Sequence, residues 1–180
     1  MATVGPSHGG RYSRVAILFH WVIAALVVAN LWIGLIGGSM PVHKAVGITV
    51  LVLTLGRIAW RLGHRPPPLP PLPPETAGWE RMVARASHFA FYVLLLVVPL
   101  TGWAMSSGAK RYPLDWFGLF PIPYLPISDS AAHLGHELHE IVGFGMAGLV
   151  ALHVAAALRH HFLLRDGVLA RMLPGRRAVP

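Results

Sequence analysis

The chain has 180 residues, of which 54% are hydrophobic and only 12% are charged, about half the charged share of soluble domains. It contains no cysteine, which excludes disulfides, cysteine-ligated iron–sulfur clusters and haem attached covalently through a C-x-x-C-H motif. The formal net charge is +8. Because the basic residues flank long apolar stretches, we interpret this charge as membrane topology and expect no nucleic-acid partner.

Four apolar stretches are long enough to cross a bilayer, since a helix needs about 20 apolar residues to span the hydrocarbon core. They lie at about 15–37, 43–62, 87–105 and 138–160. The first resembles a secretory signal but is about twice the usual length and contains His20, so we expect it to be retained. The second is the weakest, because Arg57 interrupts it. The sequence predicts an all-α fold, in which residues 1–180 form one integral membrane four-helix transmembrane bundle.

The connections between these stretches differ in character. Residues 66–74 (PPPLPPLPP) predict an extended polyproline II spacer. The connection at 106–138 carries several aromatic residues and prolines, and we expect it to fold over the outer end of the bundle. The C-terminal tail mixes apolar residues with arginines, a pattern typical of a helix lying on the inner membrane surface.

The basic residues also predict the orientation of the bundle. Twelve of the fifteen Lys and Arg residues lie in the N-terminal tail, the second connection with its helix ends, and the C-terminal tail. Lys44, Lys110 and Arg111 belong to the opposite end. The positive-inside rule therefore predicts that both termini are cytoplasmic.

Two histidines in the last apolar stretch, His139 and His153, are fourteen residues apart. Fourteen residues make almost four helical turns, so both imidazoles project from nearly the same face, roughly 21 Å apart along the axis. Imidazoles are rare inside membrane helices, and those present usually have a functional partner. The spacing suggests two cofactors stacked across the membrane.

Depth groups four histidines into two pairs. His20 and His153 each lie six residues inside the basic boundary of their span, on helices that run in opposite directions. His43 and His139 each begin a span at the outer end. Two imidazoles at one level on different helices are what bis-imidazole ligation of a haem requires.

A small residue follows each of these four histidines at position i+4, where a large side chain would fill the space of a macrocycle. These residues are Ala24, Gly47, Gly143 and Ala157. His88 fails this criterion because Tyr92 follows it, and it is either a further functional histidine near the inner haem or an interfacial residue. Arg57 lies fourteen residues after His43, where it either contacts a haem propionate or snorkels to the interface. A zinc site formed by His133, His136 and His139 is an alternative use of the outer histidines.

The chain resembles the bacterial cytochrome b561 family of small, four-span membrane cytochromes with two b haems. The resemblance covers nearly the whole sequence. It is carried by YSRVAILFHW (12–21), VHKAVGI (42–48), the polyproline connection, LHEIVG (138–143) and LHVAAALRHHFLLRDGVLARMLP (152–174). It implies that His20, His43, His139 and His153 are the axial ligands of two haem b groups, in a multi-pass protein of the bacterial inner membrane.

The resemblance also implies quinone chemistry. Similar proteins exchange electrons with ubiquinone near the inner haem, and one activity in the family is oxidation of superoxide at the periplasmic face. His160 matches a quinone-contacting histidine, and Arg159 and His88 are further candidates for the quinone site. The outer loop at 106–136 departs most from the family pattern, which leaves the electron donor open.

We therefore expect a di-haem b-type cytochrome that carries electrons between a periplasmic donor and ubiquinone, with superoxide as the first candidate donor. That activity would make the protein a superoxide:ubiquinone oxidoreductase. The alternative is a membrane-anchor electron-transfer subunit that docks a periplasmic dehydrogenase or a soluble cytochrome.

Overall fold

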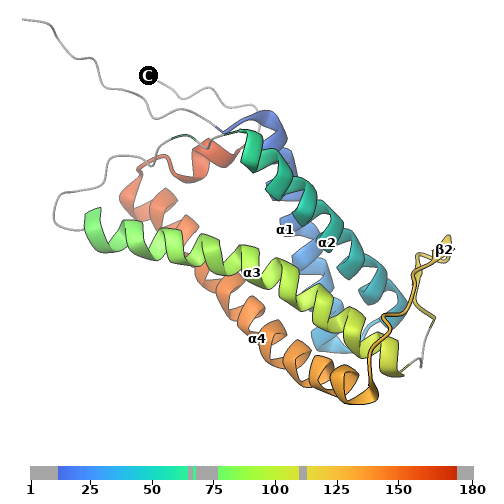
Figure 1. Ribbon diagram of the computed structural model, residues 1–180. Coiled ribbons are helices and arrows are strands. Elements are labelled where there is room, and N and C mark those ends of the chain that lie inside the picture. Colours follow the sequence, from blue (N-terminus) through green and yellow to red (C-terminus); the bar gives the residue numbers. More distant parts are fainter. Residues whose placement is uncertain (1–11, 65–66, 68–76, 110–112, 174–180) are drawn as a thin grey trace, which may run out of the picture.

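Four long helices dominate the computed structural model, which describes residues 12–64, 67, 77–109 and 113–173 (Figure 1). They are α1 (Arg14–Ile36), α2 (Met40–Gly63), α3 (Ala77–Ala109) and α4 (Asp129–Arg159). Each is long and apolar enough to cross a membrane. The predicted all-α membrane bundle is thereby confirmed.

Local sequence signals set where the helices begin and end. The Ser13 hydroxyl accepts a hydrogen bond from the Ala16 N–H (3.2 Å) at the start of α1, and Gly37 ends that helix in the left-handed region, at φ 76°. A glycine takes this conformation without the steric penalty that a Cβ brings. Pro41 lies in the first turn of α2, where its missing N–H costs nothing. The turn between α1 and α2 is therefore tight and makes the two helices antiparallel.

Two helices are longer than their apolar stretches. α3 begins at Ala77 where the sequence predicted 87, and α4 begins at Asp129 where it predicted 138. The start of α4 is capped by the Ser128 hydroxyl, which accepts a hydrogen bond from the Ala131 N–H at 3.2 Å. An acidic residue in the first turn, Asp129, adds a favourable interaction with the helix dipole. Hydropathy locates the part of a helix inside hydrocarbon and misses polar turns that continue outside it.

α1 packs along α2 and α3 packs along α4, and the two helix pairs meet through α2 and α3 (Figure 1). A small core joins them. It consists of Ile23, Val46, Val50, Leu95 and Met146. Many other apolar side chains face outward, including Trp32 and Phe144, which are 66% and 68% exposed. Helices that are apolar on all sides suit a lipid environment.

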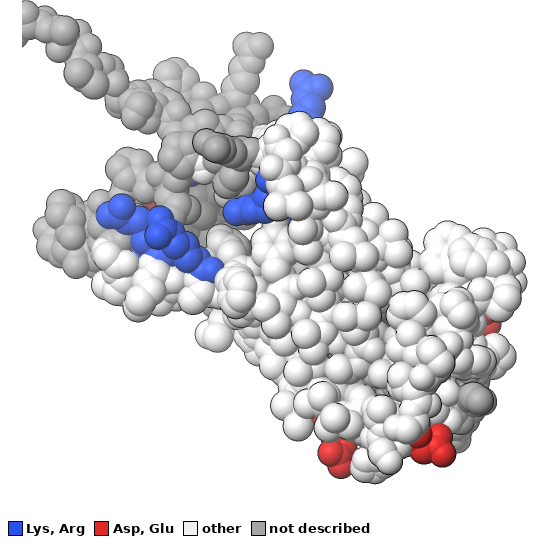
Figure 2. Space-filling view, in the orientation of Figure 1, with Lys and Arg blue, Asp and Glu red and all other residues white. Residues whose placement is uncertain are grey.

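The bundle has two chemically different ends. At the terminal end, α1 begins and α4 ends; at the hairpin end, α1 ends and α4 begins. Described arginines gather at the terminal end, whereas four of the six described acidic residues lie at the hairpin end (Figure 2). The other two, Glu80 and Asp166, lie at the terminal end. The arginines are Arg14, Arg57, Arg61, Arg81, Arg85, Arg159, Arg165 and Arg171. The cytoplasmic location of the termini remains a prediction.

The connection at the hairpin end folds onto the bundle. Its strands, β1 (Asp115–Trp116) and β2 (Phe120–Pro121), pair antiparallel. The Trp116 indole N–H donates to the Thr49 hydroxyl on α2 at 3.0 Å, and the Trp103 indole N–H on α3 donates to the Pro123 carbonyl at 2.9 Å. The connection thus covers this end, as the sequence predicted. The residues at both ends of the predicted 106–138 loop, however, belong to α3 and α4.

The C-terminal segment differs from the expected surface helix. After α4 come a π-helical turn, η1 (His160–Leu164), and a short 3-10 helix, η2 (Leu169–Met172). Arg165 and Gly167 between them adopt left-handed φ angles of 51° and 74°, which stops the helix and reverses the chain. The Trp21 indole N–H donates to the Met172 carbonyl (2.6 Å), so η2 lies against α1. The polyproline segment lies outside the described residues apart from Pro67, as does the chain beyond 173.

The α3–α4 contact depends on a glycine. A Cβ at Gly135 would lie 3.1 Å from the Ala104 Cβ and from the Met105 nitrogen, whereas a Cβ at Gly148 on the same helix would meet nothing within 4 Å. We expect Gly135→Ala to destabilise the protein by about 1–3 kcal/mol, because backbone atoms cannot move aside easily. Gly148→Ala is the matched control and should be neutral or slightly stabilising through its helix propensity. Thermal unfolding in detergent measures both, and equal melting temperatures would contradict the packing.

Candidate functional site

His43 of α2 and His139 of α4 lie together near the hairpin end. Their ring centroids are 6.0 Å apart, with the ring planes nearly perpendicular at 89°. A metal–imidazole bond is about 2 Å long, so two imidazoles on opposite sides of one metal ion have centroids about 6 Å apart. The separation of this pair is therefore compatible with axial ligation of a single iron.

Backbone carbonyls orient both of these imidazoles. The His43 Nδ1 lies 3.2 Å from the Asn30 carbonyl oxygen, and the His139 Nδ1 lies 2.9 Å from the Val98 carbonyl oxygen. The Thr101 hydroxyl is a further neighbour of the His139 Nδ1, at 3.3 Å. Because a carbonyl can only accept, Nδ1 carries the proton in each ring, and the Nε2 lone pair is left for a metal. Metal-binding histidines commonly have this arrangement.

A mostly apolar cavity of about 400 Å³ adjoins this pair, and both histidines line it together with several glycines. A Cβ at Gly143 would meet nothing within 4 Å, and one at Gly47 would meet only the Asn30 amide nitrogen at 3.7 Å. These glycines therefore leave open space beside the imidazoles. Among the described residues, the buried Asn30 Oδ1 has no hydrogen-bond partner. A planar apolar group with polar edges, such as haem, fits this set of residues.

Two other glycines leave room for the imidazole rings themselves. A Cβ at Gly34 would lie 3.0 Å from the His43 Cε1, and a Cβ at Gly102 would lie 2.9 Å from the His139 Cε1. Side chains at these two positions would push the rings out of place. Sequence reasoning identified the small residues four positions after each histidine and missed these two, because they come from neighbouring helices.

At the terminal end, the structure brings three imidazoles together rather than two. The ring centroids of His20 on α1 and His153 on α4 are 6.3 Å apart, and those of His88 on α3 and His153 are 6.1 Å apart. Depth in the sequence predicted the first contact. The two distances are nearly equal, so distance alone does not select the partner of His153.

A cationic cluster lies beside these imidazoles. The guanidinium carbons of Arg57 and Arg61 on α2 are each 5.8 Å from the centroid of the Tyr92 ring on α3. Arg57 is half-buried and lies within electrostatic range of His20 and His153. Within the described part of the chain, the buried Tyr92 hydroxyl has no hydrogen-bond partner. This cluster can bind an anionic group, and the i+4 spacing of Arg57 and Arg61 was the signal that could have added Arg61 to the predicted site.

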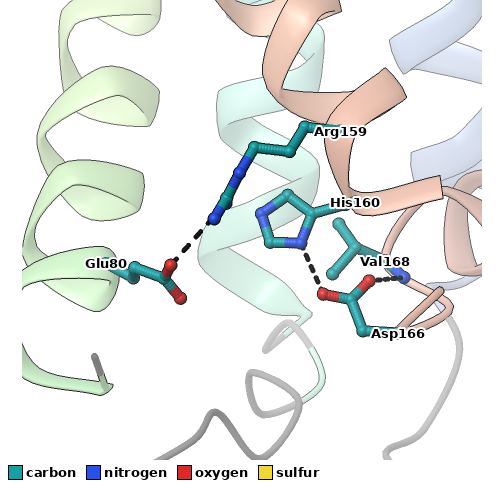
Figure 3. A network of polar contacts seen from close by, with 5 residues as sticks. All are labelled: Glu80, Arg159, His160, Asp166 and Val168. Carbon is teal, nitrogen blue, oxygen red and sulfur yellow. Dashed lines mark hydrogen bonds and ion pairs between the residues drawn. The ribbon is translucent and has the colours of Figure 1, made fainter. Parts of the chain in front are cut away.

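His160 and Arg159 lie at the end of α4, and each has an acidic partner (Figure 3). The His160 Nδ1 is hydrogen-bonded to the Asp166 carboxylate, whose other oxygen accepts from the Val168 N–H at 3.1 Å. The Arg159 guanidinium lies 3.7 Å from the Glu80 carboxylate on α3. Sequence reasoning missed both acids, because the contact to Asp166 depends on the turn at 165–167.

The alternative zinc site does not form. His133 and His136 are exposed and pair along the helix with Glu137 (3.6 Å) and Glu140 (3.9 Å), whereas His139 is directed to α3. No three histidine or acidic side chains among the described residues converge on a common metal position. The three histidines therefore do not face one common position.

Membrane-length helices with imidazoles paired at two levels are the architecture of a membrane-bound b-type cytochrome. A family model described as prokaryotic cytochrome b561 matches residues 11–175. The chain is 32% identical to cytochrome b561 homolog 2 of Escherichia coli, covering 91% of each protein. It is 30% identical to the "Probable superoxide oxidase CybB" of Yersinia pestis, covering 93% of this chain and 98% of that protein. Cytochrome b562 of Cereibacter sphaeroides is 26% identical, covering 92% and 96%.

The chain belongs to the prokaryotic cytochrome b561 family. It is therefore a multi-pass bacterial membrane protein of electron transport, and its family binds b-type haem. The resemblance read from the sequence motifs is confirmed.

We expect two low-spin b haems per chain, because each imidazole pair can fill both axial positions of one iron. His43→Ala and His139→Ala should remove one haem, and His20→Ala and His153→Ala the other. The measurement is a pyridine haemochrome assay against protein mass, with absorption spectra of each variant. His133→Ala is the control and should retain both haems, because His133 is exposed and is not among the residues that line the cavity. Loss of the same spectral component from His43→Ala and His153→Ala would refute the pairing.

His88→Ala decides which imidazole completes the second pair. We expect this variant to keep both haem spectra, because Tyr92 occupies the i+4 position where the predicted ligands have small residues. Loss of a haem from His88→Ala, together with its retention in His20→Ala, would assign His88 as the partner of His153.

Proposed function

We propose that this protein is a di-haem b-type cytochrome that carries electrons across the bacterial inner membrane from a periplasmic donor to ubiquinone. The observation that carries the proposal is the presence of imidazole pairs at two levels of one bundle, His43 with His139 and His20 with His153. Haem bound at each pair would supply one-electron chemistry. At the hairpin pair, backbone carbonyls hold the Nδ1 atoms of His43 and His139 and leave the Nε2 atom of each ring for a ligand.

Residues at the terminal end support a second haem site there. Arg57, Arg61 and Tyr92 offer two guanidinium groups and a buried hydroxyl beside His20 and His153. Guanidinium groups bind carboxylates strongly, often through two parallel hydrogen bonds. We assign this cluster to the haem propionates. Arg57 is half-buried between apolar helices, where a cation without an anionic partner is costly.

Charge supports the orientation of the bundle in the membrane. Described arginines concentrate at the terminal end, and the Asp129, Glu137 and Glu140 carboxylates lie at the hairpin end (Figure 2). The positive-inside rule assigns the terminal end to the cytoplasm. The pair His43–His139 is then the periplasmic one, and the pair His20–His153 would hold haem nearer the cytoplasm.

Superoxide is the donor that we favour. A relative carries the name "Probable superoxide oxidase CybB", and Lys44 lines the cavity beside His43 and His139. A cation at the rim of a site raises the local concentration of a small anion. In the balanced reaction, two superoxide anions lose one electron each and become dioxygen. One ubiquinone takes up these two electrons and two protons and becomes ubiquinol.

The acceptor site that we propose lies at the terminal end and contains His160, with Arg159 beside it. His160 is close to two turns beyond His153 on the same face of α4, roughly 10 Å nearer the cytoplasm. An imidazole there can hydrogen-bond a quinone carbonyl and exchange a proton with it. His88 is the next candidate, since it contacts His153 and is exposed on the bundle surface.

A second function is supported by the hairpin. Three apolar side chains at its tip are well exposed: Phe117 (48%), Leu119 (72%) and Phe120 (53%). An exposed apolar patch at the periplasmic end can dock another protein. The second candidate is therefore a membrane-anchor subunit that receives electrons from a periplasmic dehydrogenase or a soluble cytochrome.

Two half-reactions of the purified, haem-loaded protein distinguish these functions. We expect superoxide alone to reduce the haems rapidly, and added ubiquinone-1 to reoxidise them with formation of ubiquinol. Stopped-flow absorption in the haem bands measures both steps. Slow reduction by superoxide, together with copurification of a redox protein, would favour the anchor function.

His160→Ala should slow reoxidation by ubiquinone-1 by about 100-fold or more, the scale of general acid catalysis. Superoxide-driven haem reduction and both haem spectra should remain unchanged. The neighbouring His161→Ala is the matched control, since His161 is exposed and contacts Phe162. A wild-type quinone rate in His160→Ala would move the site, with His88→Ala as the next variant.

A further inference from the structure

The chain reverses directly after His160. α4 ends at Arg159, and the π-helical turn η1 starts at His160. Two residues with left-handed φ angles, Arg165 (51°) and Gly167 (74°), flank Asp166. π-helical turns and left-handed non-glycine residues are energetically unfavourable and are often found at functional sites. The reversal places the Asp166 carboxylate against the His160 ring.

The contact between His160 and Asp166 is well supported on both sides. The carboxylate bonds the His160 Nδ1 through one oxygen and accepts from the Val168 N–H at 3.1 Å through the other. Both side chains are 21% exposed. The backbone N–H therefore orients the carboxylate, and the carboxylate in turn orients the imidazole.

The neighbouring arginine leaves this pair undisturbed. Arg159 lies 3.7 Å from Glu80 of α3, so its guanidinium has a separate acidic partner. In Figure 3 the second ring nitrogen of His160 points away from Asp166, on the side where Arg159 and Glu80 lie. Nε2 is therefore directed toward Arg159 and the start of α3.

This geometry fixes the chemistry of the imidazole. An ionised carboxylate can only accept hydrogen bonds, so the proton of the singly protonated ring sits on Nδ1. A carboxylate in this position also stabilises the charge that an imidazole carries when Nε2 holds a second proton, as in other histidine–aspartate pairs. Nε2 is therefore the atom that can give a proton to a neighbouring carbonyl oxygen.

We propose that Asp166 is a positioning residue for quinone reduction: it holds His160 so that Nε2 delivers one of the two protons that ubiquinone takes up. This inference rests on the proposed function, with His160 at the quinone site. As the quinone gains two electrons, supplied by two superoxide anions, the Nε2–H bond breaks and an O–H bond forms. The ring keeps its Nδ1 proton, which stays hydrogen-bonded to Asp166. Water at the terminal end supplies a new proton to Nε2 and also supplies the second proton of the quinol.

Asp166 also has a structural role that the test must separate. Its turn leads into η2, where the Met172 carbonyl accepts from the Trp21 indole on α1. Trp21 in turn contacts the His20 ring, with centroids 5.4 Å apart. Loss of the carboxylate could therefore disturb the nearby haem site. Asp166→Asn avoids this problem, because the amide oxygen can still accept from the Val168 N–H while the negative charge is gone.

Asp166→Asn should slow reoxidation of the haems by ubiquinone-1 about tenfold, which is less than the roughly 100-fold or greater effect of losing the general acid itself. The loss should fall on kcat rather than on KM, and the solvent deuterium isotope effect on this step should rise. Superoxide-driven haem reduction, haem midpoint potentials and haem content should match the wild type. Asp129→Asn removes the same charge at the opposite end of α4 and is the control. Asp166→Glu, which restores the charge, should recover most of the rate.

The variants separate failure of this inference from failure of the quinone site. If His160→Ala leaves quinone reduction unchanged, the proposed site itself is wrong. If His160→Ala slows the reaction and Asp166→Asn does not, the site stands and the role of Asp166 is overturned. In the double variant, Asp166→Asn should add no further loss to His160→Ala, and an additional tenfold loss would overturn action through the histidine. If Asp166→Asn loses haem, the rate of reoxidation by ubiquinone-1 in Asp166→Glu decides. A rate near that of the wild type supports the inference, whereas a rate as slow as that of His160→Ala overturns it.

Discussion

A polar ring inside a membrane bundle needs a partner for each of its nitrogens, and this constraint governs the architecture of the protein. Water is absent from the hydrocarbon region, so an unsatisfied N–H or lone pair there costs several kcal/mol. At the hairpin end, the Asn30 and Val98 carbonyls satisfy one nitrogen of His43 and His139. The second nitrogen of each ring is left to a ligand. The glycines and the cavity beside His43 and His139 leave room for such a ligand.

The two ends of the bundle surround their imidazoles with different groups. The hairpin end holds its imidazoles with backbone carbonyls and covers them with a docked hairpin whose Trp116 bonds Thr49. The terminal end gathers three imidazoles, two arginines and Tyr92, and adds an ionisable pair at the end of α4. An end whose imidazoles are held by neutral backbone carbonyls suits transfer of electrons alone. An end rich in ionisable groups suits transfer that is coupled to protons.

Helix periodicity allowed much of the arrangement of the histidines to be predicted from the sequence. A rise of 1.5 Å per residue turns sequence distance into depth, and depth alone grouped His20 with His153 and His43 with His139, the contacts that the structure has. The same reasoning could not place His88 against His153, because that contact depends on how α3 rotates about its own axis. It also could not find Asp166, since a pattern of apolar and basic residues predicted a helix where left-handed turns reverse the chain. The extra turns of α3 and α4 escaped hydropathy because they are polar, and those of α4 begin at the Ser128 cap.

The pairing of the imidazoles also sets an order for biogenesis. His20 and His43 belong to the first two helices, and both of their partners lie on α4, the last of the four long helices in chain order. The contact from Trp21 to the Met172 carbonyl joins residues 151 positions apart. Neither pair can therefore form before α4 has been synthesised. A haem held by either pair would then join one of the first two helices to α4.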